Sequence, residues 1–261
     1  MTYRKFIHSG ENFELYEYER EPRYMAPRHR NRQRKGVNSD SGPRTGGENT
    51  DEALQDKTTG KRQDNAKRAA LVFRRLVASN LSRSQPPLLI TFTYEQNITD
   101  LSVGYRDYRT FVQALRYTYG KAFKYVAVPE FQKRGAVHFH ALFWGLPEEV
   151  FLQERQTRKI AGLWGVGFVF IKRTDGDGRL SSYLSKYMAK AFTDSRLRNQ
   201  KAYVASKNIK RPIEGKGIPV LWPIYDDYVG ENNIPIIDKT YGTKWLGTCR
   251  YRLFKIAPAT E

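Results

Sequence analysis

The stretch from Lys124 to Phe143 reads KYVAVPEFQKRGAVHFHALF, and it decides the fold. Its two halves, Lys124 to Phe131 and Ala136 to Phe143, are rich in β-branched and aromatic residues. A short polar loop that contains Gly135 separates them. Two such runs joined by a short loop with glycine predict a β-hairpin. We therefore expect two antiparallel strands in the middle of the chain.

The second strand of this hairpin carries the main candidate for chemistry, a histidine pair. Side chains alternate across a strand, so His138 and His140 share one face while Phe139 points to the other. Glu130 lies at the end of the first strand and can pair across to the face of the histidines. Two nitrogen donors and one oxygen donor with open positions suit Mg²⁺ or Mn²⁺, with Zn²⁺ as a substitute in vitro. The alternative is two surface histidines near an unrelated glutamate.

Further helices and strands are expected on both sides of the hairpin. Apolar residues at helical spacing predict helices over 62–80, 105–119, 147–163 and 179–192. β-rich runs predict strands over 88–94 and 167–172. This order fits an α/β (α+β) fold in which a mostly antiparallel central sheet is flanked by helices.

The predicted helix over 179–192 carries two tyrosines one turn apart. Tyr183 and Tyr187 are spaced i, i+4, and Lys186 falls on the same broad side of the helix. A phenol has a pKa of about 10 and becomes a nucleophile only when a neighbouring cation favours its phenolate. Lysines can do this, and they can also bind the phosphate under attack. The alternative is a pair of half-buried tyrosines whose lysine neighbours extend to solvent.

The two ends of the chain are expected to differ from the centre. Residues 1–60 combine few apolar side chains with dense charge, which predicts a disordered tail, because little burial offsets the entropy of ordering. We expect the folded domain over residues 61–212. Residues 213–261 mix short strands and turns, and we expect them to form a C-terminal extension packed on that domain.

The composition indicates a polyanionic partner. The 261 residues include 45 Lys and Arg against 27 Asp and Glu, which leaves a net charge of +18. Such a field attracts nucleic acid, although a ribosomal-type or merely soluble basic protein is an alternative. A single cysteine, Cys249, excludes an internal disulfide, and no apolar run approaches the roughly 18 residues of a membrane helix. We therefore expect a cytoplasmic protein.

In combination, these motifs resemble the HUH endonucleases, specifically the rolling-circle replication initiators of phages and small plasmids. Three motifs occur in the order of that family: a strand rich in Thr and Phe over 89–94, the His-Phe-His motif over 138–140, and the Tyr-x-x-Lys-Tyr motif over 183–187. Glu130 lies where such initiators often carry a third metal ligand. The resemblance covers roughly residues 86–212 and implies a central sheet of RRM-like topology, with the metal on its surface and the tyrosine helix alongside.

The resemblance also implies an activity, the nicking and rejoining of single-stranded DNA at a replication origin. Tyr183 or Tyr187 would attack the scissile phosphate and leave a 5′-phosphotyrosine link and a free 3′-hydroxyl. The sequence contains no phosphate-binding loop of the Gly-x-x-x-x-Gly-Lys-Ser/Thr type. Unwinding would therefore need a host helicase, and synthesis a host polymerase, in the bacterial cytoplasm.

Two other functions are compatible with the same residues. An HUH transposase or a plasmid mobilisation relaxase uses the same chemistry, but relaxases usually place the tyrosine before the histidines and add a third histidine. Here the tyrosines follow the histidines, and the third candidate ligand is a glutamate. A non-catalytic protein that binds DNA or RNA through basic and aromatic side chains would need neither motif.

Overall fold

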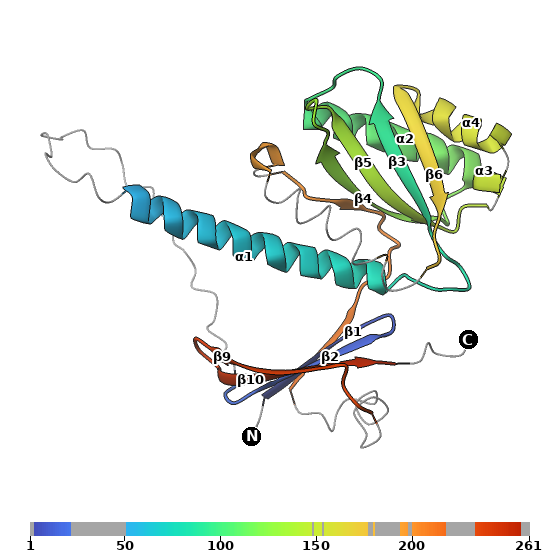
Figure 1. The fold of residues 1–261 in the computed structure, drawn as a ribbon. Helices are drawn as coiled ribbons and strands as arrows, with labels where there is room; N and C mark the ends of the chain where they lie inside the picture. The colour runs from blue at the N-terminus through green and yellow to red at the C-terminus, as the bar shows by residue number, and fades with distance from the viewer. Residues whose placement is uncertain are drawn as a thin grey trace, which may run out of the picture.

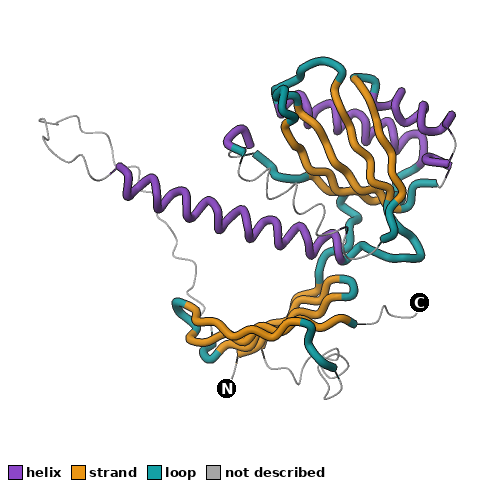
Figure 2. Tube along the Cα trace, viewed as in Figure 1, coloured by secondary structure: helices purple, strands orange, loops and turns teal. Residues whose placement is uncertain are grey.

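The computed structural model describes residues 3–21, 51–147, 149–152, 154–176, 180, 194–197, 200–217 and 233–256. In these ranges the strands form two five-stranded sheets, and every pair of neighbouring strands is antiparallel. Figure 1 shows one sheet above the long helix α1 (Asp51–Ala78) and the other below it. Figure 2 shows that the remaining long helices gather on the upper sheet. The architecture is therefore α+β, as predicted, but with a second sheet that the sequence did not indicate.

The first sheet has the strand order β6-β3-β5-β4-β7 and contains the predicted hairpin. Its strands are β3 (Leu88–Tyr94), β4 (Lys124–Phe131), β5 (Val137–Trp144), β6 (Gly167–Arg173) and β7 (Val204–Ala205). The loop between β4 and β5 is closed by a backbone hydrogen bond from Gln132 to Ala136. The short loop fixes the register, which places Glu130 directly opposite His138. The prediction of this hairpin is confirmed.

Two helices cover one face of the first sheet, α2 (Leu101–Tyr119) and α4 (Glu154–Trp164). The interface is aromatic: the ring of Phe92 lies 4.7 Å from that of Phe111 on α2 and 5.1 Å from that of Trp164 on α4. Phe139, between the two histidines, is fully buried on this side and contacts Tyr108 of α2 at 5.0 Å. The helices therefore occupy the face opposite to the histidines, as the alternation along β5 requires.

The predicted helices are confirmed in part. The helix expected over 62–80 is α1, which begins earlier, at Asp51, and buries Phe73, Leu76 and Val77 in the core of the first sheet. The segment expected over 147–163 forms the short α3 (Glu149–Leu152) followed by α4. A 3-10 helix, η1 (Ser195–Leu197), lies further along the chain. The tyrosine helix expected over 179–192 lies outside the described residues except for Leu180.

The second sheet has the strand order β8-β1-β2-β10-β9 and joins the two ends of the chain. Its strands are β1 (Tyr3–Ser9), β2 (Asn12–Tyr18), β8 (Ile213–Gly217), β9 (Ile237–Thr243) and β10 (Gly247–Lys255). The expectation of a disordered tail over 1–60 is therefore wrong for residues 3–18, and also for 51–60, which belong to α1. The likewise expected C-terminal extension pairs its strands with β1 and β2 and not with the first sheet.

Long-range pairing explains why residues 3–18 fold in spite of their charge. Phe6, Phe13 and Leu15 form a small buried cluster with Phe254 of β10, which local composition could not reveal. The charges are neutralised across strands, since Glu17 accepts from both Arg4 and Arg252. A few apolar side chains and paired charges thus offset the entropy of ordering once the distant strand is present.

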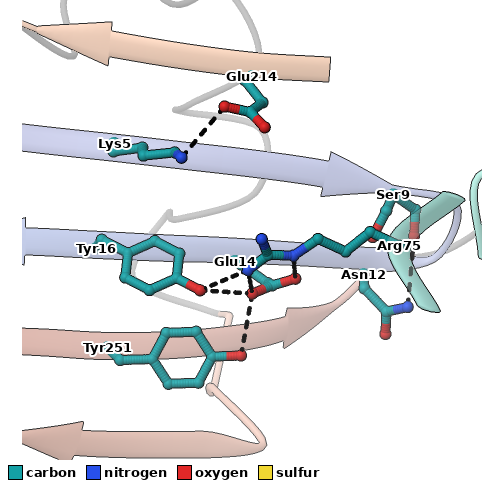
Figure 3. A network of polar contacts seen from close by, with 8 residues as sticks. All are labelled: Lys5, Ser9, Asn12, Glu14, Tyr16, Arg75, Glu214 and Tyr251. Carbon is teal, nitrogen blue, oxygen red and sulfur yellow. Dashed lines mark hydrogen bonds and ion pairs between the residues drawn. The ribbon is translucent and has the colours of Figure 1, made fainter. Parts of the chain in front are cut away.

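A polar network joins the second sheet to the end of α1 (Figure 3). Arg75 of α1 donates to the Glu14 carboxylate from Nε at 2.8 Å and from Nη2 at 2.6 Å. The hydroxyl of Tyr16 donates to the same carboxylate at 2.8 Å, and Glu14 is only 3% exposed. Beside this network the turn at Gly10 approaches α1 closely, because a Cβ at Gly10 would lie 2.2 Å from the carbonyl oxygen of Ala78. The hairpin of β1 and β2 is therefore tied to α1.

Among the described helices, none has the length and apolar character needed to cross a membrane.

Candidate metal centre

The two histidines lie next to each other on the face of the first sheet that α2 and α4 leave uncovered. His138 and His140 are both half-buried and project from β5 on the same side. Their ring centroids are 4.7 Å apart, and the ring planes meet at 73°. The strand thus presents two imidazoles to one small volume, which is the arrangement that the His-Phe-His spacing predicts.

Glu130 reaches the same volume from the neighbouring strand β4. It is paired in register with His138, but its carboxylate extends diagonally to His140. The distance from Oε2 of Glu130 to Nε2 of His140 is 3.0 Å, and both side chains are about seven-eighths buried, with 14% and 11% exposed. The structure therefore brings all three sequence-predicted residues together, with one direct contact between a carboxylate and an imidazole.

Two threonines of β3 hold the imidazole rings from the opposite edge. The hydroxyl of Thr93 lies 3.0 Å from Nδ1 of His138, and that of Thr91 lies 3.4 Å from Nδ1 of His140. Hydrogen bonds to the second ring nitrogen fix the orientation of histidines that bind metals. Sequence analysis assigned these threonines no role, although polar residues at alternate positions of an apolar strand were the available signal.

The surroundings keep His138 in its neutral form. Burial is the main cause, and the nearby ring of His140 adds to it, so that the pKa of His138 falls to about 4 although Glu130 opposes the shift. A neutral imidazole retains the lone pair that a cation requires. Among the described residues no hydrogen-bond partner reaches Nε2 of His138, and this nitrogen is a candidate donor.

The donor set fits a hard divalent cation with an incomplete protein shell. Two ligands at right angles, each about 2.1 Å from a Mg²⁺ ion, are about 3 Å apart. The 3.0 Å separation between Glu130 and His140 is compatible with that arrangement. No group of three or more His, Cys, Asp or Glu side chains forms a complete metal cage in the described ranges. Water or a substrate phosphate would have to supply the remaining ligands, as is usual for Mg²⁺ sites.

The other predicted site residues cannot be placed relative to this centre. Tyr183, Lys186 and Tyr187 lie outside the described residues. A basic group whose position is described is Arg134 in the loop between β4 and β5. It donates to the carbonyl oxygens of Tyr94 and Glu95, which holds this loop against the end of β3.

Comparison with known families places a relationship on the same part of the chain. Residues 87–192 match the model of a family described as replication-associated protein, of the ORF2 type. This range includes the strands from β3 to β6 and therefore Glu130, both histidines and both threonines. Neither the curated proteins nor the solved structures yielded a match to the chain. Over residues 87–192 the chain is thus similar to Rep-type replication-associated proteins, which supports a role in DNA replication.

Proposed function

We propose that the chain is a rolling-circle replication initiator of the HUH class, which nicks and rejoins single-stranded DNA at a replication origin. One observation carries the proposal. His138, His140 and Glu130 meet on the uncovered face of the first sheet, with 3.0 Å between Glu130 and His140, inside the range that is similar to replication-associated proteins. We assign the nuclease unit to residues 61–212.

The residues on the page fit a site for Mg²⁺ or Mn²⁺. The Nε2 atoms of His138 and His140 and the carboxylate of Glu130 would hold the cation. When bound, it would polarise the scissile phosphate and neutralise the charge that develops there. Thr91 and Thr93 would orient the two rings through their Nδ1 atoms, so that the Nε2 edges face the ligand.

The proposed nucleophile is the phenolic oxygen of Tyr183 or Tyr187. This oxygen would form a bond to phosphorus while the bond from phosphorus to the 3′-oxygen breaks. The phenolic proton would end on the 3′-oxygen, so that the products are a 5′-phosphotyrosine ester and a free 3′-hydroxyl. Lys186 would favour the phenolate and bind the phosphate. Because the ester retains the energy of the broken phosphodiester, the reverse reaction would rejoin the strand.

The charge of the chain suits this substrate. A net charge of +18 favours association with the phosphate backbone of single-stranded DNA. The 3′-hydroxyl would serve as a primer for a host polymerase, and a host helicase would separate the strands. These partners place the proposed activity in the bacterial cytoplasm.

A nicking assay with histidine variants tests the proposal. The substrate would be a panel of single-stranded oligonucleotides that tile the intergenic DNA of the replicon that encodes the chain, with Mn²⁺ or Mg²⁺ added. His138→Ala and His140→Ala should abolish cleavage and leave the melting temperature and most of the DNA affinity unchanged.

His8→Ala is the matched control, because His8 lies in β1 of the second sheet and its loss removes an imidazole outside the site. It should retain cleavage. Undiminished nicking by the His138→Ala/His140→Ala double variant in the presence of a chelator would refute the metal site.

A further inference from the structure

Strand β6 exposes two phenylalanines on a sheet face that ordinarily carries polar residues. Phe168 is 63% exposed and Phe170 is 67% exposed. The residues between and after them, Val169 and Ile171, pack against the core of the first sheet. β6 is thus apolar on both faces, and in the described sheet it is an edge strand. Large apolar side chains in such a position indicate a binding surface.

The strand register places these rings in the same rows as the histidines. Phe168 is paired with Thr93, which is paired with His138. Phe170 is paired with Thr91, which is paired with His140. All six side chains therefore project from one face of the sheet. Neighbouring strands are about 4.8 Å apart, so the rings stand about 10 Å from the histidines, with only the small threonines between them.

We propose that Phe168 and Phe170 form a stacking surface for the bases of single-stranded DNA beside the metal centre. This inference rests on the proposed function, since it concerns the nucleotides that adjoin the phosphate held at His138 and His140. Aromatic rings bind the bases of single strands without regard to sequence, because every base has a π face. The surface would thus position the strand, while the metal centre acts on its phosphate.

Charge supports nucleic acid over a protein as the occupant. Lys172 is exposed and follows Phe170 by two residues, so it projects from the same face of β6 and can pair with a phosphate. Alternating aromatic and basic side chains along a strand are typical of surfaces that bind single-stranded nucleic acid. The net charge of +18 favours the same polyanion. The surface is also continuous with the metal centre, whereas an apolar protein partner would have no need of that continuity.

The binding of a fluorescent dT oligonucleotide, measured by anisotropy in a chelator, tests the inference independently of nicking. Phe168→Ala and Phe170→Ala should each weaken binding by about 5- to 100-fold, the range for loss of one stacked base. Phe168→Trp and Phe170→Trp should retain affinity, because a larger ring preserves stacking. Tyr117→Ala is the matched control: Tyr117 is 95% exposed on α2, which covers the opposite face, and its loss should change nothing.

Abasic sites in the oligonucleotide identify the stacked bases. One abasic position should weaken binding to the wild-type chain, but the same position should cost little more once the phenylalanine beneath it is removed. Thr in place of either Phe provides a second variant that suits a strand, should the Ala variants melt early.

Three results would overturn the inference. The first is unchanged affinity in the folded Phe168/Phe170 double variant, and the second is full affinity with Leu at both positions, since Leu keeps the apolar area without a ring. The third is an altered oligomeric state with unaltered DNA binding, which would assign β6 to contact with a second copy. The inference and the proposed function fail separately: ring-dependent DNA binding without any nicking would reject only the proposed function, and nicking without ring-dependent binding would reject only the inference.

Discussion

Replacement of Arg75 by Met tests whether the second sheet is part of the same fold as the first. The guanidinium donates twice to Glu14, at 2.8 and 2.6 Å, and Glu14 is only 3% exposed. Arg75→Met keeps the apolar stem but leaves a buried carboxylate without its cation. Loss of one partner of a buried ion pair costs about 3–5 kcal/mol. The hydroxyl of Tyr16 still donates to Glu14, so we expect about 3 kcal/mol, at the lower end of that range.

A double-mutant cycle separates the pair from its surroundings. Glu14→Gln combined with Arg75→Met removes both charges, and the double variant should be more stable than Arg75→Met alone. Arg106→Met is the matched control, because Arg106 is 69% exposed and pairs only with its neighbour Asp107. Its loss should cost less than about 1 kcal/mol.

The pH dependence of this cost has a definite sign. Burial by itself would raise the pKa of Glu14, but the hydrogen bonds and charge of Arg75, with the hydroxyl of Tyr16, outweigh it and lower the pKa. A lowered pKa in the folded state stabilises the fold above the unfolded-state pKa of about 4.3, and this stabilisation is lost as pH falls through the folded-state value. The deficit of Arg75→Met should therefore be full at pH 7 and should shrink below about pH 4.

Urea denaturation followed by circular dichroism and tryptophan fluorescence measures these differences. The midpoint should fall for Arg75→Met with little change in the slope. If Arg75→Met costs no more than Arg106→Met at pH 7, or if its deficit grows as the pH falls, the account of this network is refuted.

Two further substitutions test the site and its sheet. Thr93→Val removes the hydroxyl 3.0 Å from Nδ1 of His138 and should weaken Mn²⁺ binding about 10- to 100-fold in calorimetric titration, while Thr110→Val on α2 should not; equal affinities would contradict the role of Thr93. Gly167→Ala would place a Cβ 2.1 Å from the carbonyl oxygen of Thr93 at a φ of +159°, and it should lower the thermal stability by about 2 kcal/mol or more. Gly162→Ala, in open space on α4, should instead raise stability by about 0.5–1 kcal/mol, and a reversed order of these two melting temperatures would show that the approach of β6 to β3 is not close.

The hairpin of β4 and β5 was predictable because its information is local. The two strands are separated by a few residues, so the loop length determines the register and with it the pairing of Glu130 with His138. The alternation along β5 then placed Phe139 in the core and the histidines on the other face. What the sequence could not supply was the third strand, β3, whose threonines meet the histidines only through pairing across 45 and 49 residues.

The second sheet was missed because its pairing is distant in the sequence. Residues 3–18 carry a dense run of Tyr and Glu that is typical of unfolded segments, and their partners lie in β8 and β10, more than 200 residues later. Phe13 and Leu15 alternate with Glu14, which was a weak local sign of a strand. The exposure of Phe168 and Phe170 was hidden for a related reason: the strand was predicted, but only its register with β3 shows which face it leaves open.

The covalent adduct is the most direct test of the proposed chemistry. Incubation of the chain with a cleavable single-stranded oligonucleotide and Mn²⁺, followed by mass spectrometry of tryptic peptides, should show a 5′-phosphoryl oligonucleotide on Tyr183 or Tyr187. Tyr183→Phe and Tyr187→Phe should each retain some adduct, and the double variant should retain none. Cleavage that proceeds without any adduct, or with an adduct on a residue outside this pair, would contradict the assignment of a tyrosine nucleophile to these positions.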